Sequence, residues 1–246
     1  MESTQESTIG MVGPQAAEHE LERIRAAYDR RDQSIPAGRY ARMERVNLYR
    51  AHECELALAD LFRSAGLISL KGMRILDLGC GRGGTLRQLL EYDAEPALLF
   101  GLDLLASRIE PAFRLSPNLQ LLRGNAAQLP FPDGSFQLVA QFLLFTSVLD
   151  EGFKRAIAQE ISRVLAPGGK LIWYDFAFNN PKNPDVRGIG RCEIKSLFPR
   201  WRMRLRRVTL APPLARLIAE LSPAVYYALA DVRFLCTHYI GLLEKR

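Results

Sequence analysis

The sequence predicts an α/β fold, doubly wound, with a mostly parallel sheet covered by helices on both faces. Beyond Gly72, short apolar runs alternate with helical patterns, as expected for βα units joined by right-handed crossovers. The first run ends in a glycine-rich turn that opens a helix, and the second ends in a carboxylate, Asp103. Both features fall where an open parallel sheet binds its ligands.

The segment ahead of this pattern is predicted to hold two helices. Residues 1–15 are polar and glycine-containing, so we expect a flexible tail. Apolar side chains recur at helical spacing over residues 16–32 and 40–65, on either side of a Pro-Gly break. We interpret residues 16–66 as a helical cap in front of a core domain at 67–246.

The core domain is predicted to alternate strands with helices and then to become less regular. The expected strands are 73–78, 98–103, 119–122, 136–142 and 170–176, and the expected helices are 84–92, 105–115 and 151–165. The last third predicts an arginine-rich edge strand at 202–208, a broken helix at 214–230 and a final strand at 236–243. A helical insertion at about 211–235 separates these two strands.

Composition and charge exclude several classes of protein. The chain has 246 residues, 48% of them hydrophobic and 24% charged, as in folded globular chains. The start shows no export signal, so we expect a cytoplasmic protein. No apolar run is long enough to span a membrane, which leaves only a peripheral membrane contact. The net charge of +6 favours anionic partners without choosing among them, and the spacing of the four cysteines predicts no metal site.

Residues 73–85, MRILDLGCGRGGT, carry the clearest functional signal. Glycines accept positive φ and let backbone N–H groups approach a ligand closely. Asp103 follows Gly79 by 24 residues, a position from which a carboxylate accepts hydrogen bonds from a ribose diol. The pattern predicts a nucleoside-containing cofactor at the carboxyl ends of the first two strands.

Two kinds of cofactor fit such a turn. Residues 79–84 match GxGxxG, a pattern that by itself indicates dinucleotide binding only weakly. Asp77 stands two residues before the first glycine. A carboxylate there gains little from facing a pyrophosphate, whereas a cofactor with a cationic amino-acid end would be stabilised by it. The charge therefore argues against NAD.

Five motifs in order resemble the class I S-adenosylmethionine-dependent methyltransferases, specifically the type 11 group, over roughly residues 70–176. They are LDLGCGRG at 76–83, GLD at 101–103, GNA at 124–126, LPFPDGSFQLV at 129–139 and RVLAPGGKL at 163–171. The resemblance implies a Rossmann-like methyltransferase fold with seven strands, the last antiparallel, and S-adenosylmethionine as cofactor. Segments further along are similar to a bacterial subgroup often associated with polysaccharide or secondary-metabolite genes.

The resemblance also implies which residues bind the cofactor. The glycine turn would lie against the methionine portion, Asp103 would hold the ribose hydroxyls, and Asn125 and Ala126 would contact adenine. Asn125 stands where such families usually carry Asp, and its carbonyl oxygen can still accept a hydrogen bond. The expected cofactor-binding residues are Asp77, Gly79, Cys80, Gly81, Gly83, Asp103, Leu104, Asn125, Ala126 and Gln141.

The acceptor is expected beyond the fourth and fifth strands, because ligands bind at the carboxyl ends of parallel strands. Methyl transfer from a sulfonium depends on alignment and desolvation, and sometimes on a base. Our candidate catalytic residues are Asp175, His238 and Tyr174, each of which has an alternative as a packing residue. The N-terminal helices, with Tyr28, Tyr40 and His52, are expected to close over the site.

We therefore expect a methyltransferase for a small-molecule acceptor, with a hydroxyl of a sugar, glycan or secondary metabolite favoured. Two alternatives stay open: an RNA or protein methyltransferase, and a non-catalytic protein that binds S-adenosylmethionine. The chain reads QFLLF at 141–145, where methyltransferases for amino groups of bases carry Asn/Asp-Pro-Pro-Tyr/Phe, and this argues against a nucleic-acid partner. The sequence determines neither the acceptor atom nor the oligomeric state.

Overall fold

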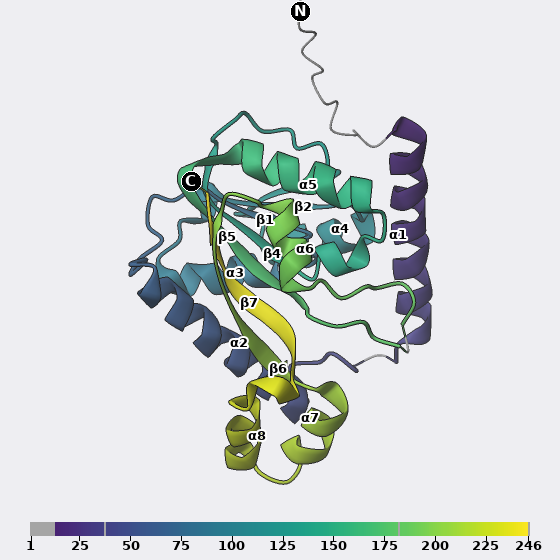
Figure 1. The fold of residues 1–246 in the computed structure, drawn as a ribbon, viewed down its shortest axis with the longest axis vertical. Coiled ribbons are helices and arrows are strands. Elements are labelled where there is room, and N and C mark those ends of the chain that lie inside the picture. Colours follow the sequence, from purple (N-terminus) through teal and green to yellow (C-terminus); the bar gives the residue numbers. More distant parts are fainter. Residues whose placement is uncertain (1–12, 37, 182, 246) are drawn as a thin grey trace, which may run out of the picture.

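The fold is described from a computed structural model, which covers residues 13–36, 38–181 and 183–245. Most of the predicted tail at 1–15 lies outside the described residues. The remaining chain forms a central sheet with helices on both faces (Figure 1).

The sheet has seven strands in the order β3-β2-β1-β4-β5-β7-β6. Their bounds are β1 Ile75–Leu78, β2 Leu99–Asp103, β3 Gln120–Arg123, β4 Phe136–Phe142, β5 Leu165–Phe176, β6 Arg202–Leu210 and β7 Cys236–Glu244. Strand β7 pairs antiparallel with both β5 and β6, and the remaining pairs are parallel. The predicted doubly wound sheet with an antiparallel last strand is confirmed.

The order of the strands creates the position of the site. The chain runs outward from β1 through β2 to β3 and then returns to β4 on the other side of β1. At such a reversal the connections after two neighbouring strands diverge to opposite faces and leave a crevice at the carboxyl ends. All residues of β1 are buried, as expected for a central parallel strand covered on both faces.

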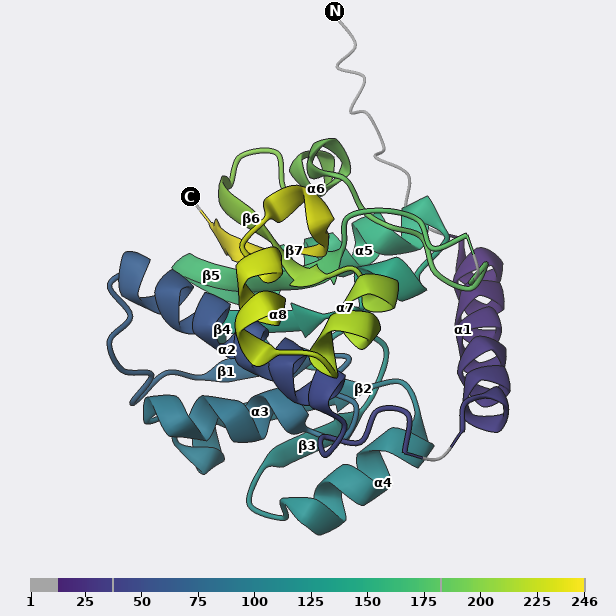
Figure 2. The ribbon, with the colours of Figure 1, turned by 90° about the horizontal axis from the view of Figure 1, so that it is seen from below.

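Two layers of helices cover the sheet (Figure 2). On one face lie α1 (Pro14–Ser34), α5 (Glu151–Val164) and α6 (Arg191–Leu197), which pack on a core that includes Leu76, Val139 and Trp173. On the other face lie α2 (Arg45–Ser64), α3 (Gly84–Leu89) and α4 (Ala106–Leu115). The second core includes Ile75 and Ile172.

Residues 211–235 connect β6 to β7 and contain α7 (Pro212–Ala219), α8 (Pro223–Ala230) and a 3-10 turn at Arg233–Leu235. A proline stands in the first turn of each helix, where the missing N–H costs no hydrogen bond. Ser222 caps α8 by accepting a hydrogen bond from the Val225 N–H. The break predicted within residues 214–230 therefore falls between two helices that each begin at a proline.

The two N-terminal helices separate, which differs from the single cap expected over residues 16–66. Helix α1 stands beside the carboxyl ends of the central strands (Figures 1 and 2). Helix α2 packs instead on the opposite face of the sheet, against β6 and β7, through Leu58 and Phe62 among others. Each helix carries one apolar stripe, and the two stripes are buried on different faces.

Candidate functional site

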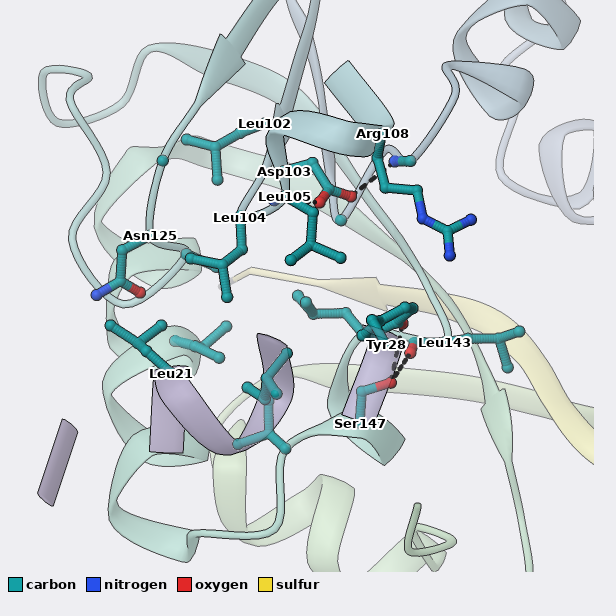
Figure 3. A pocket seen from close by; sticks show the side chains of 18 of the residues that line it. Leu21, Tyr28, Leu102, Asp103, Leu104, Leu105, Arg108, Asn125, Leu143 and Ser147 are labelled. Atoms are coloured by element: carbon teal, nitrogen blue, oxygen red, sulfur yellow. Dashed lines mark hydrogen bonds between the residues drawn. The ribbon is translucent and has the colours of Figure 1, made fainter. Parts of the chain in front are cut away.

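A cavity of about 130 Å³ opens at the carboxyl ends of β1, β2 and β4, between the sheet and α1 (Figure 3). Its lining comes from the glycine turn, the end of β2, the segments after β3 and β4, three side chains of α1, and single turns of α4 and α5. The lining residues used below are Leu21, Ile24, Tyr28, Gly79, Gly81, Asp103, Leu104, Leu105, Arg108, Asn125, Ala126, Phe142, Leu143, Leu144 and Ser147.

The glycine turn forms the floor of the cavity. Gly79 and Gly81 have φ of 71° and 54°, values that residues other than glycine rarely adopt. A Cβ at Gly81 would meet no heavy atom within 4 Å, so the space above this residue is open. Gly83, at φ 72°, caps α3 and does not line the cavity.

The backbone N–H groups of the turn are used within the protein, contrary to our expectation that they face a ligand. Gly79 and Cys80 donate to the Leu102 carbonyl, and Gly83 donates to the Cys80 carbonyl. The Gly81 N–H donates to the Asp103 carboxylate at 2.8 Å. The glycines therefore favour close approach of a ligand by lacking side chains rather than by offering donors.

Asp103 joins the end of β2 to the glycine turn. One carboxylate oxygen accepts from Gly81, and the other accepts from the Leu105 N–H at 2.9 Å (Figure 3). Burial raises the pKa of this carboxyl, although both backbone hydrogen bonds oppose the rise. Each carboxylate oxygen can accept a second hydrogen bond, so Asp103 can hold the turn and a ligand hydroxyl together.

Asp77 is the least satisfied polar side chain near the turn. It is 1% exposed, and neither carboxylate oxygen has a hydrogen-bond partner among the described residues. Burial raises its pKa well above the usual value, and the nearby charge of Asp103 raises it further. A buried carboxylate without a partner is costly, and Asp77 is not among the residues that line the cavity.

Asn125 and Ala126 line the far end of the cavity together with Leu104. The Asn125 carbonyl oxygen accepts from the Ala127 N–H at 2.9 Å, which fixes the turn after β3. The oxygen that we expected to face adenine thus already has one partner, and a ligand would share it.

Two other predicted cofactor residues point into the protein. Cys80 is buried, and its sulfur lies so near Gly101 that a Cβ there would be 2.9 Å away. Burial raises the pKa of the Cys80 thiol. Gln141 is fully buried, and its side-chain oxygen accepts from the Leu144 N–H at 3.2 Å. Neither side chain lines the cavity.

The predicted catalytic side chains also lie outside the cavity lining. Asp175 is fully buried and accepts hydrogen bonds from the hydroxyl and the N–H of Thr146. Burial raises the pKa of Asp175 to about 7. This carboxylate therefore braces the segment after β4, which forms one wall of the cavity.

His238 and Tyr174 form part of a packed cluster on the α2 face. The imidazole is 4% exposed and lies between the rings of Tyr174 and Phe176, with centroids 4.9 and 4.0 Å away. Burial lowers the pKa of His238 to about 3. The Tyr174 hydroxyl lies 2.8 Å from the hydroxyl of Thr209, and both are buried.

Thr209 has an unusual backbone for a β-branched residue, with φ of 68°. Its N–H donates to the Glu53 carboxylate of α2, and its hydroxyl also contacts the sulfur of Cys54 at 3.8 Å. The carbonyl of Thr209 accepts from the Thr237 hydroxyl at 3.2 Å. This one residue thus connects α2, β5, β6 and β7.

Helix α1 contributes two site residues that the sequence did not reveal, Leu21 and Ile24. Together with Tyr28 they face the cavity, and polar contacts hold the helix in place. Glu20 is 4% exposed and accepts from the Leu149 N–H at 2.6 Å. The Tyr28 hydroxyl lies 3.3 Å from that of Ser147 (Figure 3).

Of the residues expected to close over the site, Tyr28 alone lines the cavity. Tyr40 is half exposed beside Arg31. His52 lies on α2 and contacts the Tyr227 hydroxyl of α8 at 3.4 Å. Arg108 lines the cavity without having been predicted; it donates to Asp32 at 2.6 Å.

Fold and site together define a class of protein. A doubly wound sheet, a glycine turn after the first strand and a carboxylate after the second are the elements of a nucleoside-cofactor domain. Asp77, which has no hydrogen-bond partner among the described residues, is an unfavourable neighbour for a pyrophosphate because both groups carry negative charge when ionised.

Comparison with known families identifies the class further. Residues 75–169 match the family described as methyltransferase domain. Residues 75–169 are therefore similar to a methyltransferase domain, in agreement with the resemblance carried by the five motifs. The match names no subgroup, so the type 11 assignment stays a prediction.

Individual relatives agree with this identification. The chain is 38% identical over 120 residues to phthiotriol/phenolphthiotriol dimycocerosates methyltransferase 1 of Mycobacterium ulcerans, covering 48% of this chain and 43% of the relative. It is 31% identical over 165 residues to demethylmenaquinone methyltransferase of Lactococcus lactis, covering 65% of this chain and 62% of the relative. The chain thus spans less than two thirds of the length of these relatives.

A solved structure shares the fold. A SAM-dependent methyltransferase of Methanosarcina mazei superposes with a TM-score of 0.56 at 17% identity, covering 75% of this chain and 98% of the other. Among the described residues, no helix combines the length and hydropathy that crossing a bilayer requires.

Proposed function

We propose that the protein is an S-adenosylmethionine-dependent methyltransferase whose acceptor is a small molecule with a largely apolar body and a reactive hydroxyl. The observation that carries the cofactor assignment is Asp77, a buried carboxylate that has no hydrogen-bond partner among the described residues and stands just before a glycine turn that is open at Gly81. The methionyl end of this cofactor carries an ammonium and a sulfonium, which supply the missing positive charge.

The residues present fit the remaining parts of the cofactor. Gly79 and Gly81 would lie beneath the methionyl group, since neither presents a side chain to the cavity. Asp103 would accept from the ribose hydroxyls with the lone pairs that its two backbone hydrogen bonds leave free. Asn125 and Ala126 would contact adenine at the far end.

When bound, the cofactor supplies a methyl group already activated by a positively charged sulfur, so displacement depends mainly on alignment and exclusion of water. Leu21 and Ile24 of α1 and Leu143 of the opposite wall are the side chains that would exclude water. Asp175 would act through Thr146 by holding that wall in position. Transfer to a hydroxyl also releases its proton, which would pass to solvent because none of the predicted catalytic side chains lines the cavity.

The apolar character of the cavity favours one kind of acceptor. Leu105, Phe142, Leu143 and Leu144 supply the wall on the side away from the adenine end. An apolar wall gains free energy by covering apolar surface, whereas a sugar would leave most of its hydroxyls without partners there. We therefore favour a hydrophobic metabolite over a glycan. The names of the relatives, among them a demethylmenaquinone methyltransferase, agree with a small-molecule acceptor.

The test begins with calorimetric titration of the purified chain with S-adenosylmethionine, its demethylated product and NAD. Binding of the two adenosyl ligands without NAD supports the proposal, and binding of neither contradicts it. Transfer of a labelled methyl group is then measured on hydroxylated quinones and phenols, on glycans and on RNA. Transfer to glycans or RNA alone would refute the apolar acceptor, and tight cofactor binding without any transfer would favour a non-catalytic binding protein.

A matched pair of variants controls the placement of the cofactor. Gly81 and Gly66 both have positive φ, and an added Cβ would meet nothing within 4 Å at either position. Alanine at either position strains the backbone by about 1–2 kcal/mol. Only Gly81 lines the cavity, so Gly81→Ala is expected to weaken cofactor binding and Gly66→Ala to leave it unchanged. Equal affinities in the two variants would contradict the placement.

A further inference from the structure

The segment between β6 and β7 projects beyond the sheet as a small helical tip (Figure 1). We define the tip as residues 212–235, which contain α7, α8 and the turn that leads into β7. Its inner side is anchored: Ala215, Ala219 and Tyr226 are buried, and the Tyr226 ring packs 5.2 Å from Tyr49 of α2. The tip is therefore a fixed part of the fold.

The outer side of the tip is apolar. Leu217 is 64% exposed, Leu221 71% and Phe234 78%. Residues 223–230 of α8 contain no charged side chain. Isolated exposed apolar residues need no explanation, but several gathered on one small projection indicate an interaction surface.

The segment that leads into α2 extends this surface. Arg45 forms an ion pair with Glu220 of the tip at 3.7 Å, which places the start of α2 beside the end of α7. Just ahead of it, Met43 is 93% exposed and Tyr40 is 50% exposed. Residues 38–45 therefore adjoin the tip, and we call the two segments together the tip surface.

The exposed basic residues of the tip surface outnumber its exposed acidic residues. They are Arg39, Arg42, Arg45, Arg216 and Arg233 on the basic side and Glu44, Glu220 and Asp231 on the acidic side. Long arginine stems cover apolar surface while their heads reach polar groups, and exposed apolar side chains within a basic rim are typical of proteins that bind anionic membrane surfaces.

We infer that the tip surface docks on an anionic lipid bilayer. The exposed leucines and Phe234 would enter the interfacial region, and the arginines would contact lipid headgroups. A second copy of this chain fits less well, because two such surfaces would bring their arginines together and the whole chain carries a charge of +6. The projecting shape also suits insertion into a fluid surface better than packing against another projection.

Docking also has a consequence for the site. This consequence rests on the proposed function, whereas docking itself does not. Strand β6 runs parallel to β5, because both pair antiparallel with β7. The tip therefore begins at the same carboxyl edge of the sheet that holds the cavity. A bilayer-bound protein would take an apolar acceptor from the membrane and not from water.

Vesicle flotation of the full chain tests the inference. The protein is mixed with phosphatidylcholine vesicles and with vesicles that also contain phosphatidylglycerol. We expect binding to the anionic vesicles at least tenfold tighter than to the neutral ones. Leu217→Glu with Phe234→Glu should reduce that binding at least tenfold. The matched control is Phe113→Glu with Leu115→Glu on α4, two side chains 53% and 63% exposed outside the tip surface, and it should bind as the wild type does.

Three other results would overturn the inference that the tip surface binds a bilayer. No binding of the wild type to anionic vesicles would refute it, as would equal losses in the tip and control variants. If the wild type did not bind vesicles but self-associated in sedimentation equilibrium, and the tip variant did not self-associate, the tip surface would be a contact between copies of the chain. If the glutamates lower the Tm, Leu217→Gln with Phe234→Gln repeats the comparison. Calorimetry with S-adenosylmethionine is run on each variant, so that failure of the proposed function is distinguished from failure of docking.

Discussion

Replacing Asp77 by asparagine tests the most informative residue of the site. The substitution keeps the size of the side chain and removes its charge. Because neither carboxylate oxygen has a partner among the described residues, the change breaks no hydrogen bond seen in the structure. Any effect on ligand binding therefore reports the charge itself.

The magnitude follows from the group that the carboxylate would meet. A hydrogen bond between charged partners contributes about 1.5–3 kcal/mol, which corresponds to a factor of roughly 10 to 150 in Kd. We expect Asp77→Asn to weaken S-adenosylmethionine binding by this factor. Adenosine, which lacks the amino-acid end, should bind the variant as it binds the wild type.

Stability in the absence of ligand should change in the opposite direction. Burial raises the pKa of Asp77 in the folded protein well above its usual value of 3.8. Its stabilising contribution is therefore complete below pH 3.8 and is lost as the pH rises through the folded pKa, with a limiting slope of about 1.4 kcal/mol per pH unit. Asparagine does not titrate, so Asp77→Asn should gain stability relative to the wild type as the pH rises.

Isothermal titration calorimetry and urea unfolding, from about pH 4 to about pH 8, measure both effects. Asp93→Asn is the matched control, because Asp93 is exposed and remote from the cavity. An unchanged Kd for S-adenosylmethionine in Asp77→Asn would refute the argument. So would an equal loss of adenosine binding, because Asp77 would then support the glycine turn and not the amino-acid end.

Three further predictions follow from buried titratable groups. The pKa of Asp175 is about 7 in the folded protein, so this group should lower the free energy of unfolding by on the order of 4 kcal/mol between about pH 4 and about pH 7. Asp175→Asn should remove this pH dependence from urea unfolding. A pH profile unchanged by the substitution would contradict the prediction. The pKa of His238 is lowered to about 3, so its imidazole should stay neutral in the folded protein and reduce the free energy of unfolding as the pH falls below about 6.5. An NMR titration midpoint near pH 6.5 would contradict the lowered pKa. Glu20→Ala removes the acceptor for the Leu149 N–H. Loss of this charged hydrogen bond should speed amide hydrogen exchange in α1 by roughly 10- to 150-fold. Glu18→Ala is the control, because Glu18 is an exposed residue of the same helix, and it should leave the exchange rates unaltered.

The core of the fold was predictable because its signals are local. Strand and helix periods can be counted within one segment, and the glycine turn with Asp103 is a short pattern with a direct physical reason. The structure confirms the sheet and gathers Gly79, Gly81, Asp103, Leu104 and Asn125 around one cavity.

The rest depended on contacts between distant segments. The period of α1 shows that the helix has an apolar stripe but not which surface buries it. Asp175 at the end of a buried strand suggested a catalytic acid, yet Thr146 satisfies it from another segment. The N–H groups of the glycine turn were expected to face a ligand, but the carbonyl of Leu102 and the carboxylate of Asp103 accept from them. Neither partner could be assigned without coordinates.

Thr209 carries a consequence for building chimeras between methyltransferases. It bonds to Glu53, which lies 156 residues earlier in the chain, and these two residues stand on opposite sides of the matched domain at 75–169. A graft that exchanged only residues 202–246 would leave the half-buried Glu53 carboxylate and the Tyr174 hydroxyl without their partner, and a half-satisfied polar network is less stable than an apolar one. Helix α2 and strands β6 and β7 are therefore a single unit of recombination, split in sequence by the domain that they flank.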